Sequence, residues 1–354
     1  MNEKLDPNKR EFINKFLFID GQYFLTKNWS FLKHREILSL KNLLELTLKS
    51  INKIQSKVMA DNIILLWDSW PYKKTKELIE AGVDYKGDRE FALDRINEIK
   101  ELLLTEKDPQ KVIQLKKELE KKEKDHAFFL VRRDAKLVLK EWLPQIGIGS
   151  LSITALEADD LACMASSWSS KNIDLSKNER SVICSSDSDW LSFCSPTTDM
   201  YRTTKEEVWL NYDNAPNQIP LKYRKFGVNL YEYNLLHNAY YGDHNNLKKD
   251  KYTVENFSFS SVLSLYSQGR MDEISHISKV FNALNVLKYY DLTIEEKFND
   301  VCLNLTPNYG AYVDFCAKYE LSLTPYLYED LMYYPEKSKK HKNNKHNDTW
   351  RKKQ

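Results

Sequence analysis

The stretch Phe16-Leu17-Phe18-Ile19-Asp20-Gly21 decides the expected fold, because a short apolar run ends there on an aspartate. Two further runs end in the same way: residues 62–67 run into Asp68, and residues 181–186 run into Asp187. Such runs are typical of buried parallel strands, whose carboxyl ends meet at one edge of an open α/β sheet and form ligand sites there. We therefore expect these three aspartates to lie close together.

A fourth acidic group, Glu157-Ala158-Asp159-Asp160, precedes an apolar helical stretch, and Asp189 stands close behind Asp187. Acids in a first helical turn are ordinary capping residues, but three of them facing the strand ends are harder to explain in that way. So many carboxylates would repel one another unless cations lay among them, and an all-oxygen site suits Mg²⁺ or Mn²⁺ better than zinc. The pattern predicts a metal-dependent phosphoryl-transfer site.

The composition is that of a folded chain with segregated charge. With 354 residues it exceeds one average domain, so two domains, or one large domain with appendages, are expected. The formal net charge is only +2, from 53 basic and 51 acidic residues, yet basic residues gather in 100–140 and 335–354. That asymmetry fits a basic surface guiding a polyanion to an acidic site, and a solvated surface of mixed charge is the open alternative.

The cysteines and the amino terminus exclude some classes of protein. The five cysteines form no Cys-x-x-Cys pair and have no histidine at zinc spacing, which predicts reduced packing residues. The first residues hold no apolar signal core, and no run reaches the roughly 18 apolar residues of a membrane span. We expect a cytoplasmic protein and a monomer.

The first half of the chain follows a strand, helix, strand order that a charged segment then interrupts. Helical spacing of apolar residues predicts a helix over residues 35–59, directly before the strand that ends at Asp68. Residues 88–135 are strongly charged with narrow apolar stripes, which predicts two helices joined at Asp108-Pro109. This pair is either a helical protrusion or a mobile arch that grips single-stranded nucleic acid.

The α/β pattern resumes after Ala135. We expect a helix through Leu143, a strand over residues 152–156, a helix from the 157–160 group to about 169, and a strand over 181–185. Two extended segments at 199–203 and 207–211 follow, and the chain beyond about 225 reads as helical and aromatic, with a sharp turn at residues 240–243.

These motifs resemble those of a known family. In addition to the acids above, the chain carries Tyr85-Lys86-Gly87-Asp88-Arg89 and Tyr241-Gly242-Asp243, in the order found in flap-endonuclease-type 5′-nucleases. The chain most resembles the T-even bacteriophage ribonuclease H branch of that family, over roughly residues 14–330. The resemblance implies an α/β, PIN-like fold with a central mostly parallel sheet flanked by helices.

The resemblance also implies an activity. It is that of a metal-dependent, structure-specific 5′ to 3′ nuclease that removes RNA primers and 5′ flaps from nicked or forked DNA during replication. It implies two Mg²⁺ ions, with Mn²⁺ as a substitute, and Lys86 and Arg89 as the basic pair at the scissile phosphate. The acids that match the metal-binding positions are Asp20, Asp68, Glu157, Asp159, Asp187, Asp189 and Asp243, with Asp160 contributing through water.

The implied organisation has three parts. Residues 1–230 form the nuclease domain, with an arch at about 88–135, residues 231–334 form a helical DNA-binding region, and residues 335–354 form a basic disordered tail. The tail either adds salt-sensitive DNA affinity or docks on a replication partner such as a single-strand-binding protein or a sliding clamp. Branched, nicked or RNA-primed duplex DNA is the expected substrate.

The chain departs from the family pattern at three places, one of which is an arch segment longer than usual for the phage branch. Asn246 stands where a second aspartate is usual after Gly242-Asp243, which weakens the second metal site, and no glycine-rich helix-hairpin-helix is readable in residues 247–260. Four further basic residues are candidates for phosphate contacts, each against an ordinary surface role: Lys73, Lys74, Arg132 and Arg133.

Three alternative classes remain. A haloacid-dehalogenase-type phosphatase needs a second acid two residues after the first, where this chain has Gln22. A PIN-type single-strand ribonuclease would share the acids but not the long arch. A catalytically weakened protein that binds forked DNA without cutting it is favoured only by Asn246.

Overall fold

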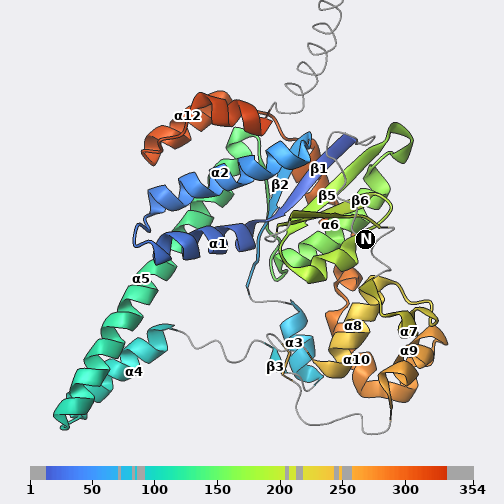
Figure 1. Cartoon of the computed structure of the whole chain (residues 1–354), viewed down its shortest axis with the longest axis horizontal. Helices are drawn as coiled ribbons and strands as arrows, with labels where there is room; N and C mark the ends of the chain where they lie inside the picture. Colours follow the sequence, from blue (N-terminus) through green and yellow to red (C-terminus); the bar gives the residue numbers. More distant parts are fainter. Residues whose placement is uncertain are drawn as a thin grey trace, which may run out of the picture.

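The centre of the molecule is a six-stranded sheet with the strand order β4-β2-β1-β5-β6-β7 (Figure 1). The computed structural model describes residues 13–70, 73–81, 84–85, 92–203, 207–212, 218–242, 247–248 and 257–332. The strands of the sheet are β1 (Ile13–Asp20), β2 (Asn62–Leu66), β4 (Gly149–Leu151), β5 (Glu179–Ser185), β6 (Thr198–Thr203) and β7 (Glu207–Leu210). All neighbours pair in parallel except β7, which runs antiparallel to β6 at one edge. The expected α/β class is thus confirmed.

Alternating side chains of the central strand build two cores, one on each face of the sheet. Phe16 and Phe18 point into one core, whereas Leu17 and Ile19 point into the other. The first core is covered by α6 (Ala158–Asn172), α8 (Leu230–Tyr241), α9 (Phe259–Ser267), α10 (Ser275–Leu284) and α11 (Leu292–Leu303). The second is covered by α1 (Gly21–His34), α2 (Leu40–Val58), α5 (Pro109–Ile146) and α12 (Tyr309–Lys318). Because both faces are covered, the central strands β1 and β2 carry consecutive apolar residues and not an alternating pattern.

Two helices lie between β1 and β2, where we expected one. The helix predicted over residues 35–59 is confirmed as α2, which begins at Leu40 because the Ser39 hydroxyl caps the Asn42 N–H at 3.2 Å. The preceding α1 was missed, since Asp20 both ends β1 and caps α1 through the Tyr23 N–H at 2.8 Å. No loop residue separates the two elements.

The charged segment forms the predicted pair of helices. The first, α4 (Ala92–Thr105), runs beside α5, which begins after the capping residue Asp108 with Pro109 in its first turn. Ion pairs Arg95–Glu118 and Lys100–Glu123, each with an N···O distance of 2.9 Å, connect the two helices. The start of α5 and all of α4 project away from the sheet (Figure 1). The helix expected after Ala135 through Leu143 is confirmed as the last part of α5, which continues unbroken to Ile146.

The strand expected over residues 152–156 is also misplaced. The strand is β4, which ends at Leu151, and the following residues form a turn closed by a hydrogen bond from the Leu156 N–H to the Ile153 carbonyl at 3.1 Å. Ala155 in this turn has a φ of 65°, which an extended strand cannot contain. The predicted strands 181–185, 199–203 and 207–211 are confirmed as β5, β6 and β7.

Short elements complete the chain. They are α3 (Lys73–Glu80), β3 (Asp84–Tyr85), η2 (Leu175–Lys177), η3 (Ser188–Phe193), α7 (Leu221–Arg224), β8 (Leu247–Lys248), η5 (Met271–Ile274) and η6 (Val286–Tyr289). β3 and β8 form a separate antiparallel pair. The helical character predicted beyond residue 225 is confirmed for the described part of that region, and the tail from 335 lies outside the described residues.

The cysteines are free thiols, and four of the five are buried. Burial raises the pKa of Cys163 and of Cys194 to about 12, so neither thiol is a ready nucleophile. Within the ranges described, none of the helices combines the length and apolar character that crossing a membrane would require.

Candidate active site

The three strand-end aspartates meet at the carboxyl edge of the sheet, as their positions predict. Asp20 is the last residue of β1, while Asp68 and Asp187 each follow a neighbouring strand, β2 and β5, by two residues. β1 lies between those two strands and pairs with both in parallel, so all three chains leave the sheet on the same side. Asp68 and Asp187 both lie close enough for their charges to act on the Asp20 carboxylate.

Asp20 is held in place and buried. Its side chain is 7% exposed and accepts hydrogen bonds from the Tyr23 N–H at 2.8 Å and the Ser185 hydroxyl at 3.0 Å. Burial, together with the nearby charges of Asp68 and Asp187, raises the pKa of Asp20 to about 7 despite those hydrogen bonds. An ionised Asp20 therefore lacks a compensating cation among its described neighbours.

The residue after Asp20 must be small. A Cβ atom on Gly21 would lie 2.9 Å from the Trp67 ring and 3.0 Å from the Leu66 carbonyl oxygen. The start of α1 consequently packs directly against the end of β2, which places Asp20 beside the strand that carries Asp68. This close approach explains the glycine at the junction of strand and helix.

Asp68 is anchored to the start of α6. The N–H groups of its neighbours Trp67 and Ser69 donate to the carbonyls of Leu151 and Leu156 at 3.0 and 2.8 Å. Its carboxylate accepts the Ala158 N–H, the first amide of α6, at 2.8 Å. Asp68 is therefore fixed against the positive end of a helix, where a carboxylate is stabilised.

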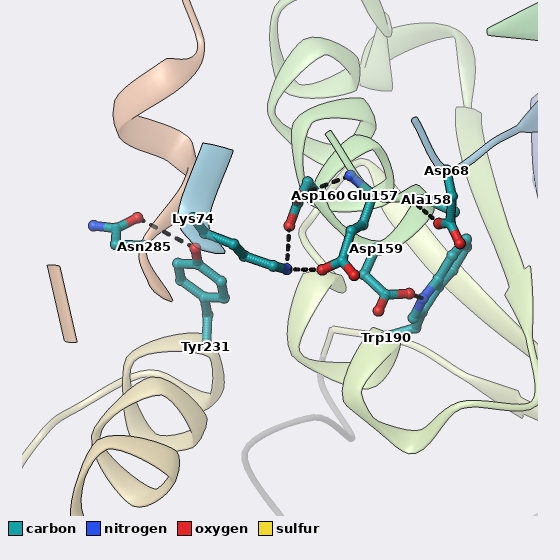
Figure 2. A network of polar contacts seen from close by, with 9 residues as sticks. All are labelled: Asp68, Lys74, Glu157, Ala158, Asp159, Asp160, Trp190, Tyr231 and Asn285. Atoms are coloured by element: carbon teal, nitrogen blue, oxygen red, sulfur yellow. Dashed lines mark hydrogen bonds and ion pairs between the residues drawn. The ribbon is translucent and has the colours of Figure 1, made fainter. Parts of the chain in front are cut away.

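The first turn of α6 brings Glu157, Asp159 and Asp160 to the same edge (Figure 2). Asp159 points toward Trp190, whose Nε1–H donates to it at 2.6 Å. Burial raises the pKa of Asp159 well above its usual range, and the charges of Asp20 and Glu157 add to that effect. Asp159 thus joins the strand-end acids to the helix acids.

The structure buries Lys74, which the sequence suggested as either a phosphate contact or an ordinary surface residue. It is 9% exposed, and its ammonium lies between the carboxylates of Glu157 and Asp160, 2.8 Å from Asp160 Oδ1 (Figure 2). The other oxygen of Asp160 accepts the Glu157 N–H at 2.9 Å. Both oxygens of Asp160 therefore bind groups of the protein. This arrangement suits a residue that holds Lys74 and Glu157 in place and does not contact an ion directly.

Asp187 and Asp189 lie in a more open part of the site. Both are exposed, and Asp187 caps η3 by accepting the Asp189 N–H at 3.0 Å. The Asp187 N–H donates to the Ser185 hydroxyl at 3.1 Å, the same hydroxyl that donates to Asp20. Lys86, Arg89, Asp243 and Asn246 lie outside the described residues.

A lysine that the sequence analysis overlooked stands beside Asp68. Lys136 on α5 donates to the Asp68 backbone carbonyl at 2.8 Å. Burial lowers the pKa of Lys136, and the charges of Lys140 and Arg132 lower it further, while Asp68 raises it. These three cations follow one another at intervals of four residues along α5. The four-residue spacing of Arg132, Lys136 and Lys140 can be read from the sequence, and it could have identified these residues as a basic stripe on one face of the helix.

The other basic candidates contact aromatic rings or acids. The Arg132 guanidinium lies over the Trp29 and Phe129 rings at 5.0 and 5.4 Å. Arg133 is exposed and pairs with Asp134 at 3.1 Å. The Lys73 ammonium lies 5.2 Å from the centre of the Tyr289 ring.

The donor chemistry of the cluster fits a divalent cation. Its oxygens belong to carboxylates, two of which are costly to ionise where they lie. Across the described residues, however, no three His, Cys, Asp or Glu side chains are arranged closely enough to form a ready-made ion site. The acids converge without forming a closed chelate.

The acidic edge is distinct from a cavity elsewhere in the molecule. A cavity of about 420 Å³ lies between α6, η3 and α8, with Cys163, Phe193 and Tyr231 in its lining and none of the acids above. The acid site lies instead at the end of the sheet, where Asp187 and Asp189 are exposed to solvent.

The chain is similar to several solved structures at low sequence identity. The T5 D15 protein crystallised with metal ions is 14% identical, with a TM-score of 0.48 over 87% of this chain and 98% of its own. The bacteriophage T5 flap endonuclease in a complex with DNA and metal ions is 16% identical, with a TM-score of 0.48 over 87% of this chain and 100% of its own. The T5 5′-exonuclease with bound zinc is 15% identical, with a TM-score of 0.44 over 92% of this chain and 99% of its own.

No family model and no curated protein sequence matches the chain.

Proposed function

We propose that the chain is a nuclease of the flap-endonuclease type, which uses divalent ions to hydrolyse phosphodiesters in branched or RNA-primed DNA. The observation that supports it is the meeting of Asp20, Asp68 and Asp187 at one sheet edge, beside the α6 acids. Each of the three carboxylates accepts a hydrogen bond from the start of a helix, but these capping roles do not require the carboxylates to lie together, and like charges at one place repel each other. A cation-binding site explains the grouping.

The residues proposed to hold the ions are the acids of this edge other than Asp160. They are Asp20, Asp68, Glu157, Asp159, Asp187 and Asp189, together with Asp243 by resemblance. Bound Mg²⁺ or Mn²⁺ would neutralise the carboxylates, polarise the phosphate and activate water for hydrolysis. Asp160 is proposed to act through Lys74 and the Glu157 N–H, to which its oxygens are bound.

The protein's own groups would orient these ligands and attract the substrate. Trp190 fixes Asp159, Ser185 fixes Asp20, and the start of α6 fixes Asp68. Lys136 contacts Asp68, and the cationic stripe that it forms with Arg132 and Lys140 would attract a phosphate backbone. Lys86 and Arg89 are proposed, by resemblance alone, to stabilise charge on the scissile phosphate.

The finer assignment is to the T-even ribonuclease H branch, with removal of RNA primers and 5′ flaps. It rests on the ordered set of motifs between Asp20 and Asp243. Binding to a single-strand-binding protein or a sliding clamp, and a monomeric state in the cytoplasm, belong to the same proposal.

A protein that binds forked DNA without cutting it is the second candidate. Asn246 and the open arrangement of the described acids favour it. A labelled 5′-flap substrate and an RNA-primed substrate, each incubated with Mg²⁺ and with EDTA, separate the two. The nuclease proposal expects cleavage with Mg²⁺ only, and binding without cleavage under both conditions would select the second candidate.

Asp61→Asn is a matched control for variants of the acidic edge. Asp61 directly precedes β2, at the opposite end of the same strand from Asp68, and pairs with Lys15 at 3.2 Å. Its loss removes one carboxylate from the same strand without touching the proposed site. Cleavage by this variant is expected to equal that of the wild type.

A further inference from the structure

Lys74 is a positive charge built into the acid site. Its ammonium contacts Glu157 and lies 2.8 Å from Asp160, and its side chain is 11% exposed against 4% for each carboxylate. These residues come from α3 and from the start of α6, which are separated by 86 positions in the case of Lys74 and Asp160. The contact therefore depends on the tertiary fold and not on local sequence.

The position of α3 fixes the ammonium where it is. The Lys73 N–H donates to the Ala155 carbonyl at 2.8 Å, which ties the start of α3 to the turn before α6. On the far side, Glu77 accepts the Tyr289 hydroxyl at 2.5 Å and pairs with Lys288. Leu78 of the same helix is fully buried. A helix held on three sides leaves Lys74 little freedom to turn away.

Glu157 interacts with both Lys74 and Asp159. One of its oxygens contacts Lys74, and its charge also acts on Asp159, the residue that connects to Asp20. A divalent ion bound among Glu157, Asp159 and Asp20 would share Glu157 with an ammonium that is already there. Two cations that share one carboxylate repel each other.

We propose that Lys74 is a positioning residue that stabilises the acid site without a divalent ion and weakens the binding of the ion that uses Glu157. This inference rests on the proposed metal site and adds to it a residue that sets the affinity for metal. Lys74 would then reduce the repulsion among the carboxylates when no divalent ion is bound, and it would also lower the affinity of the site for that ion.

The test compares Lys74→Met with Lys74→Arg and with Lys76→Met. Methionine keeps the length of the side chain without its charge, and arginine keeps the charge. Lys76 lies on the same helix with its side chain 84% exposed, in a loose pair with Glu80 at 3.9 Å, and serves as the control. The midpoint of thermal unfolding is measured at pH 8 in EDTA and over a Mn²⁺ titration, and Mn²⁺ affinity is measured by calorimetry.

We expect Lys74→Met to unfold at a lower temperature than the wild type in EDTA and to regain most of that loss with Mn²⁺. The Mn²⁺-induced rise in midpoint should be at least about twofold larger than in the wild type, since an ion that binds only the folded state stabilises it more when it binds more tightly. The Mn²⁺ dissociation constant should fall roughly tenfold, since a like charge a few ångströms away is removed. Lys74→Arg and Lys76→Met should resemble the wild type.

The possible failures are distinguishable. Equal Mn²⁺-induced rises in the wild type and Lys74→Met would overturn the role of Lys74 and leave the metal site standing. No Mn²⁺-induced rise in either protein would overturn the metal site itself. A Lys74→Met protein that folds only with Mn²⁺ supports the inference in its strongest form, and one that is unfolded with and without Mn²⁺ contradicts it.

Discussion

The acidic edge of the sheet and the α4–α5 hairpin are both rich in charged residues, but these residues differ in how deeply they are buried and how they are paired. In the hairpin, acids and bases alternate and pair near the surface, as in Lys100–Glu123, whose side chains are 53% and 50% exposed. At the edge, Asp20, Glu157 and Asp160 are at most 7% exposed, and Glu157 and Asp160 share the ammonium of Lys74. Surface pairs contribute little and cost little, whereas buried like charges cost free energy that only a function justifies. Burial, more than the number of charges, marks the site.

The largest effect is expected from a substitution that removes one of the acids at the edge of the sheet. Asp159→Asn removes one negative charge beside Asp20 while keeping the volume and an oxygen that can accept from Trp190. Cleavage of a 5′-flap substrate should fall by more than about 100-fold, because loss of a group that holds or orients a catalytic metal costs at least this much. DNA binding measured in Ca²⁺ should stay close to that of the wild type. Turnover similar to that of Asp61→Asn would refute the role of Asp159.

The second prediction concerns stability and pH. The pKa of Asp20 is raised in the fold from 3.8 to about 7, so the folded state holds a proton between these values that the unfolded state has lost. The contribution of Asp20 to stability therefore falls as pH rises from about 4 to about 7, and above that the metal-free fold bears a cost of up to about 4 kcal/mol. Asp20→Asn should unfold at higher denaturant concentration than the wild type at pH 8 in EDTA, although it should not cleave.

Chemical denaturation of both proteins at pH 5 and pH 8 checks this sign. The gain from Asp20→Asn should be largest at pH 8 and fall to roughly a third of that value at pH 5, because the loss begins near pH 4. A variant that is less stable than the wild type at pH 8 would mean that the hydrogen bonds to Asp20 outweigh its burial.

A smaller effect is expected at the cationic stripe. Lys136→Met should weaken binding to a forked DNA by about threefold to tenfold and lower the slope of log affinity against log salt by about one, as loss of one phosphate contact does. Lys177→Met is the matched control, because Lys177 precedes β5 at the opposite end of the strands. Equal binding by the two variants over a salt titration would remove Lys136 from the DNA surface.

The smallest effect is expected in the hairpin. Lys100→Ala breaks the pair with Glu123, in which both side chains are about half exposed. The midpoint of thermal unfolding should change by about 2 °C or less, since exposed ion pairs contribute little. A much larger loss would show that charge in the hairpin is as consequential as charge at the edge, and the contrast drawn between the two regions would fail.

The sequence predicted the parts of the site that depend on strand ends. Asp20, Asp68 and Asp187 meet because parallel strands release their chains at the same edge, and this follows from the order of apolar runs alone. Lys74 and Lys136 could not be placed in the same way. Their contacts join segments 86 and 68 residues apart, and such contacts depend on how α3 and α5 pack.

The errors in the fold have local physical causes. The helix α1 went unseen because Asp20 is both the end of a strand and the cap of a helix, so no turn residues separate them. The strand β4 was placed too late, because residues 152–156 have the composition of a strand but turn back at Ala155. In both cases the backbone hydrogen bonds, and not residue preference, set the boundary.

The most direct test of the central claim is anomalous diffraction from a crystal soaked in Mn²⁺. The claim is that Asp20, Asp68, Glu157, Asp159 and Asp187 converge in order to hold divalent ions. We predict at least one Mn²⁺ peak whose ligands include Asp20 or Asp159 together with Asp68 or Asp187. An ordered crystal with Mn²⁺ bound elsewhere on the surface and none at this edge would contradict it.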